Sequence, residues 1–131
     1  MEPIWVQQRA VLLAHEESLA EHGGPPGVRD LGLLESALAR PKNLFAYSES
    51  EPSLQRMAAA YAFGIVANHP FVDGNKRTAL IVSIGFLKLN GLLLTADKAD
   101  RYVTFYGLAA GTIGEDQIAD WFEQNTVPYL S

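Results

Sequence analysis

The chain has 131 residues, of which 48% are hydrophobic, and its 10 basic against 15 acidic side chains give a net charge of −5. This size fits one domain, residues 1–131, that can bury a core of its own. The acidic balance argues against direct nucleic-acid binding and against attachment to anionic membranes by the domain as a whole. Because the chain has no cysteine, disulfides, thiolate catalysis and cysteine-ligated metals are excluded.

Neither a secretion signal nor a membrane span is expected from the sequence. Residues 1–5 lack a basic segment followed by a long apolar stretch. The apolar run 79–87 is interrupted by Lys88 and is too short to cross a bilayer. We therefore expect a cytoplasmic protein with no membrane partner.

The first part of the chain shows helical spacing of apolar residues. Residues 5–21 predict an amphipathic helix, and its apolar positions are Val6, Ala10, Leu13, Ala14 and Leu19. The glycine- and proline-rich segment 23–27 ends this helix. Asp30 can cap a second helix that Pro41 is expected to stop after residue 40, which leaves an irregular connection up to residue 52.

Two strongly apolar helices follow and enclose a polar loop. Residues 53–68, with Pro52 in the first turn, leave almost no polar face. Residues 76–89 are equally apolar, and Asn90 and Gly91 give the second helix a C-terminal stop. Helices of this composition must be buried on most sides, so we expect them to form a central helical hairpin.

The last third of the chain predicts two further helices. Residues 92–95 form a short extended piece, after which Asp97 begins a helix that ends near Gly111. Glu115 places negative charge in the first turn of a final helix, where it favours the helix dipole. The predicted fold class is therefore all-α, a compact helical bundle.

The loop between the two apolar helices carries most of the reactive groups. Residues 69–77 read His-Pro-Phe-Val-Asp-Gly-Asn-Lys-Arg. Asn75 is a good N-cap, so Lys76 and Arg77 fall in the first turn of a helix, where positive charge is unfavourable by roughly 0.3–1 kcal/mol per residue. Free N–H groups and two cations at a helix start suit a phosphate, and Gly74 lets the backbone approach it closely.

This nine-residue pattern resembles the signature of the Fic/Doc superfamily. Lys76 stands where Fic adenylyltransferases have glycine, which makes the loop similar to that of the Doc (death on curing) toxins. Segment 23–30, the Leu-Glu-Ser-Ala-Leu run at 34–38 and the order of the helices are also Doc-like. The resemblance implies a Fic-like helical bundle with the loop at its centre.

The resemblance also implies an activity and partners. A Doc toxin uses ATP to phosphorylate a threonine of elongation factor Tu, which arrests translation, and it is neutralised by a cognate antitoxin. The implied enzyme is thus a protein serine/threonine kinase of a bacterial toxin–antitoxin pair.

The residue types suit this phosphoryl transfer. His69 would be the general base for the target hydroxyl. Asp73 would bind Mg²⁺, a hard ion that prefers carboxylate and phosphate oxygens. Gly74, Asn75, Lys76 and Arg77 would hold the phosphates, and the two cations would counter the charge that develops in the transition state. Phe71 is expected to anchor the loop in the core.

Two departures from the Fic pattern favour the kinase. Fic adenylyltransferases carry a second arginine three residues after the first, and Leu80 occupies that position here. A lysine at position 76 would crowd the nucleotide pose that the Fic glycine allows and favour the reversed pose with the γ-phosphate toward His69. The chain also lacks the Fic inhibitory motif, so control would come from a separate protein, as an antitoxin would provide.

Other interpretations remain open at this level. Adenylyl transfer is the alternative activity, and a non-catalytic antitoxin-binding or corepressor module is the alternative class. Segment 23–27 with Arg29 is either a connecting loop or a flap that grips substrate. His15 and His22 are expected on the surface, and an apolar groove on the first helix is the expected antitoxin site.

Overall fold

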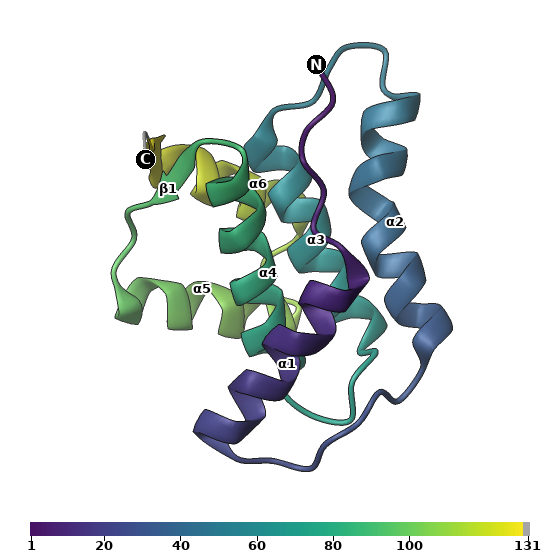
Figure 1. Ribbon diagram of the computed structural model, residues 1–131. Coiled ribbons are helices and arrows are strands. Elements are labelled where there is room, and N and C mark those ends of the chain that lie inside the picture. Colours follow the sequence, from purple (N-terminus) through teal and green to yellow (C-terminus); the bar gives the residue numbers. More distant parts are fainter. Residues whose placement is uncertain (130–131) are drawn as a thin grey trace.

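The computed structural model describes residues 1–129, which contain six helices and one two-stranded sheet (Figure 1). The elements in chain order are α1 (Gln8–His22), α2 (Leu31–Tyr47), α3 (Leu54–Asn68), α4 (Asn75–Leu89), β1 (Leu92–Leu94), α5 (Lys98–Ala110), α6 (Glu115–Gln124) and β2 (Thr126–Pro128). The predicted all-α class is confirmed. None of the helices in this described part is long and apolar enough to cross a membrane.

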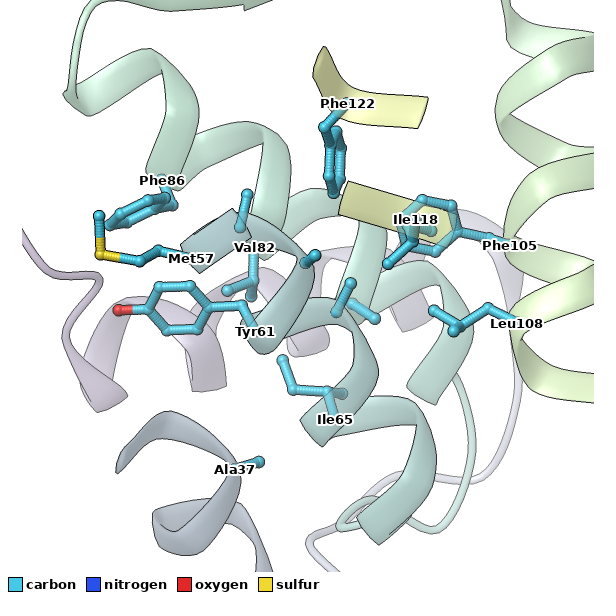
Figure 2. Packing of buried hydrophobic residues seen from close by; sticks show 14 of the residues in the cluster. Ala37, Met57, Tyr61, Ile65, Val82, Phe86, Phe105, Leu108, Ile118 and Phe122 are labelled. Atoms are coloured by element: carbon cyan, nitrogen blue, oxygen red, sulfur yellow. The ribbon is translucent and has the colours of Figure 1, made fainter. Parts of the chain in front are cut away.

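Helix α3 lies at the centre of the bundle and packs against α2, α4 and α6 (Figure 1). Its small residues let the neighbours come close: an added Cβ at Gly64 would lie 3.3 Å from the Ala37 backbone in α2. Figure 2 shows larger buried side chains of α3, α4, α5 and α6 that pack together in the core, among them Tyr61, Phe86, Phe105 and Phe122. The apolar sequence of α3 is thus explained by burial on most of its faces.

Helices α3 and α4 pack against each other and are joined by the loop 69–74. This is the expected central hairpin. Its two helices bury Ala58, Tyr61 and Ile65 on one side and Ala79, Val82 and Phe86 on the other. The loop is therefore held between two rigid, buried elements.

The prediction that Pro41 stops the second helix is wrong. Helix α2 continues through Pro41 to Tyr47, and Pro41 is buried. A proline inside a helix costs about 3 kcal/mol. The final turn offsets this cost because Leu44 and Phe45 pack against the core, and Phe45 makes an edge contact with Trp5 at 5.9 Å between ring centroids.

Two other boundaries differ from the predictions. Helix α1 begins at Gln8, because residues 1–7 run extended and insert the Trp5 ring against Phe86. The predicted extended piece at 92–95 contains β1, which pairs antiparallel with β2, a strand the sequence did not predict. The register places Leu93 opposite Val127.

Candidate active site

His69 ends α3 in a left-handed backbone conformation, with φ 50° and ψ 55°. Among residues 1–129 it is the one non-glycine residue with positive φ. This conformation costs an L-residue about 1–2 kcal/mol, so the surrounding structure must hold it. Its side chain is exposed and faces a cavity at the start of α4.

The Asn75 side chain joins the start of α4 to the loop backbone at Phe71. The sequence predicted it as the N-cap of α4, but that position belongs to Gly74, with φ 79°, and Asn75 is the first helical residue. Its buried amide accepts a hydrogen bond from the Phe71 N–H at 2.9 Å and donates one to the Phe71 carbonyl at 3.0 Å. Because the side chain is engaged in this way, its N–H at the helix start is the group that can meet a phosphate.

Phe71 anchors the loop in the core, as predicted, with no exposed surface. Its ring is stacked on the imidazole of His15 at 3.8 Å between centroids and 13° between planes. His15 Nε2 also lies 2.7 Å from the carbonyl oxygen of Asp73. The expectation of a surface His15 is wrong: the residue is 3% exposed, because the buried face of α1 runs through Val11, His15 and Leu19.

The carboxylate of Asp73 lies against segment 23–30. A Cβ added to Gly24 would clash with Asp73 Oδ2, and Gly24 has a φ of +121°. Both observations require glycine at this position. The backbone of the segment therefore forms one wall beside the Asp73 carboxylate.

The two cations of the loop are held by different neighbours. Lys76 Nζ lies over the rings of Tyr102 and Tyr106 in α5, 5.2 and 5.1 Å from their centroids. Arg77 Nε donates to Ser18 Oγ at 3.1 Å, and its Nη2 donates to the Gly23 carbonyl at 3.4 Å. Both cations sit in the first turn of α4, as the sequence predicted.

All six candidate residues line one cavity of about 400 Å³. Its lining consists of Val66, His69, Asp73, Gly74, Asn75, Lys76, Arg77 and Ala109. The volume is in the range of small-molecule and cofactor sites. A base, one carboxylate, two cations and a helix N-terminus thus meet around a space large enough for a polyphosphate.

The donor set around Asp73 fits magnesium held together with a phosphate ligand. Residues 1–129 contain no group of three or more His, Asp or Glu side chains able to hold a metal by themselves. Mg²⁺ commonly takes one or two carboxylates and completes its coordination with water and substrate phosphates. Asp73, which lines the same cavity as Lys76 and Arg77, could contribute one such carboxylate.

Sequence reasoning missed the residues that support the site. They are His15, Ser18, Gly24, Tyr102 and Tyr106. A signal for two of them was present, since Val11, His15 and Ser18 follow helical spacing on one face of α1. The tyrosines lie more than 25 positions from Lys76, and no local pattern connects them to it.

Comparisons with known proteins identify the family of this chain. A model of the Fic/DOC family matches residues 5–87. The protein named "Toxin Doc" from Mycolicibacterium smegmatis is 45% identical over 75 residues, which cover 57% of this chain and 58% of that protein. The "Protein kinase doc" of Escherichia phage P1 is 32% identical over 117 residues, which cover 88% of this chain and 90% of the relative.

The family match includes the loop at 69–77, all of α3 and most of α4. The family match agrees with the all-helical bundle. The chain belongs to the Fic/Doc family, with Doc toxins among its relatives.

Proposed function

We propose that this protein is a Doc-like toxin that transfers the γ-phosphate of ATP to a threonine hydroxyl of elongation factor Tu and so arrests translation. The observation that carries the proposal is the convergence of His69, Asp73, Lys76 and Arg77 on one cavity at the N-terminus of α4. The name of the phage P1 relative, "Protein kinase doc", supports the reaction class.

The transfer needs one proton acceptor and several positive groups. The threonine oxygen attacks the γ-phosphorus while the bond to the bridging oxygen of ADP breaks, and His69 takes the hydroxyl proton. Lys76, Arg77 and the N–H groups at the start of α4 stabilise charge on the phosphate oxygens. A magnesium ion at Asp73 would neutralise further charge on the same phosphates.

Two features favour γ-transfer over adenylyl transfer. Leu80 occupies the place of the second arginine of Fic adenylyltransferases and is partly buried against the core, so that phosphate ligand is missing. The Lys76 side chain is held beside the phosphate site by Tyr102 and Tyr106. A cation fixed there supports the pose with the γ-phosphate toward His69.

A binding module that forms a complex with an antitoxin is the second candidate. An apolar groove of about 540 Å³ runs between α1 and α4, and its walls include Val6, Ala10, Ala14, Ile81, Gly85 and Leu89. Such a groove suits the apolar face of an amphipathic helix. We propose that a helix of the cognate antitoxin occupies it, in agreement with the "Toxin Doc" name of one relative.

The test uses ATP labelled on the α- or the γ-phosphate, with Mg²⁺ and purified elongation factor Tu. We expect label from γ on a threonine of the factor. Label from α would identify an adenylyltransferase instead of a kinase. No label from either position would favour the antitoxin-binding module. Co-purification with the product of the neighbouring gene, tested with Ala10→Glu as the groove variant, checks the partner separately.

A further inference from the structure

Arg29 is bonded to three consecutive residues at the end of α3. Its Nε donates to the His69 carbonyl at 2.7 Å, and its Nη2 donates to the Asn68 carbonyl at 2.9 Å. Its backbone N–H donates to the Pro70 carbonyl at 2.7 Å. One residue of the segment between α1 and α2 thus holds the chain on both sides of the His69 α-carbon.

The surrounding backbone strengthens this connection. Val28 forms an antiparallel bridge with Phe71, and the Val72 N–H donates to the Gly27 carbonyl at 3.1 Å. The segment therefore runs alongside the loop, joined to it by one isolated β-bridge, and both lie at the same end of the bundle (Figure 1). Because this pairing fixes its backbone, Arg29 can direct its planar guanidinium at two neighbouring carbonyls.

These carbonyls are groups that a helix leaves unsatisfied at its C-terminus. A cation at that end satisfies them and favours the helix dipole. Because one planar guanidinium holds the carbonyls of Asn68 and His69, it also fixes the two peptide planes that set the left-handed conformation of His69. That conformation determines where the imidazole projects, because the side-chain direction follows from the backbone angles.

We propose that Arg29 is the positioning residue for His69, which it holds in the orientation that presents the imidazole to the cavity. Among the described residues Arg29 is not one of those that line the cavity, so it acts through the backbone of His69. This role differs from gripping substrate, because the guanidinium is already engaged with the protein's own carbonyls. The inference rests on the proposed phosphoryl transfer and deepens it.

The test compares Arg29→Ala and Arg29→Lys with the wild type in γ-phosphate transfer. Arg9→Ala is the matched control, since Arg9 is exposed on α1. We expect kcat to fall at least about tenfold in Arg29→Ala, as a general base contributes about 10²–10⁴-fold when correctly placed. The KM for ATP should stay within about twofold, because the phosphate ligands are untouched. Arg29→Lys keeps the charge but not the planar guanidinium, so its kcat should lie between those of Arg29→Ala and the wild type.

A second measurement follows the His69 imidazole by NMR and needs no activity. We expect its chemical shifts to move in Arg29→Ala and not in Arg9→Ala, with both variants folded by circular dichroism. Unchanged His69 resonances, a kcat within twofold of wild type, or losses that follow the folded fraction would each overturn the positioning role. If the wild type transfers no γ-phosphate, the proposed function fails, and the NMR result alone decides the role of Arg29.

Discussion

The imidazole of His15 connects the first helix to the loop that carries the candidate active site. It lies parallel to the Phe71 ring at 3.8 Å, and its Nε2 is 2.7 Å from the Asp73 carbonyl oxygen. Because a carbonyl can only accept, Nε2 must carry the hydrogen in this contact. His15 thereby fixes both Phe71, the anchor of the loop, and the backbone of Asp73, the proposed magnesium ligand.

Replacing His15 should destabilise the protein. His15→Ala removes a buried stacked ring and leaves the Asp73 carbonyl without this donor, which we expect to cost about 2–4 kcal/mol of unfolding free energy. Urea unfolding measures the difference. His22→Ala, on the exposed end of the same helix, should change stability by less than about 0.5 kcal/mol, and equal losses in both variants would contradict the structural role of His15.

Replacing His69 should remove activity but leave the fold intact. The side chain is exposed and contributes little to the core, so His69→Ala should unfold close to the wild-type midpoint. Loss of the general base should lower γ-transfer by about 10²–10⁴-fold. Toxicity in growing cells provides the second readout, and growth arrest as strong as that of wild type would reject the catalytic assignment.

A side chain at position 24 should disturb Asp73. Gly24→Ala places a Cβ against the Asp73 carboxylate, whereas the same change at Gly23 meets open space. Both variants suffer positive-φ strain of about 1–3 kcal/mol, so Gly23→Ala is the matched control. We expect only Gly24→Ala to raise the Mg²⁺ concentration needed for half-maximal transfer; identical Mg²⁺ curves would remove Asp73 from the magnesium site.

The two tyrosines of α5 should contribute to the selectivity of the site through Lys76. Changing both Tyr102 and Tyr106 to Leu removes two ring faces, each worth about 0.5–1 kcal/mol to an ammonium at an exposed site. The two faces together are worth about 1–2 kcal/mol, so we expect kcat/KM for γ-transfer to fall by at most about five- to thirtyfold. The Tyr→Phe pair keeps both faces and should retain wild-type kinetics. Lys76→Gly should impair γ-transfer more strongly, and unchanged transfer would show that this side chain has no role.

Alkaline stability should depend on Tyr61. Burial raises the pKa of Tyr61 above its ordinary value, although its oxygen accepts a hydrogen bond from the Val6 N–H at 3.1 Å. The unfolded chain therefore loses this proton near pH 10 while the folded chain keeps it, and stability falls as pH rises through and beyond that value. Urea unfolding between pH 8 and pH 11 should show a steeper decline for wild type than for Tyr61→Phe.

Much of the fold could be predicted because the apolar pattern of α3 and α4 has only one physical solution, which is burial at the centre of a bundle. The grouping of the loop residues around one cavity could be predicted because reactive groups are concentrated within nine positions, whereas the role of each residue stays a prediction. The predicted helix end at Pro41 was wrong because the packing of Leu44 and Phe45 outweighs the local backbone preference of proline. The predicted exposure of His15 was wrong because its neighbours in sequence are charged, whereas its hydrogen-bond partner, Asp73, lies 58 residues away in the chain.

The pairing of the Asn75 amide with both backbone groups of Phe71 affects the thermodynamics of ligand capture. Folding of the domain already removes the conformational freedom of the three residues between these anchors, 72–74. A nucleotide bound as proposed would consequently meet N–H groups already aligned, and little of its binding free energy would be lost to arranging them.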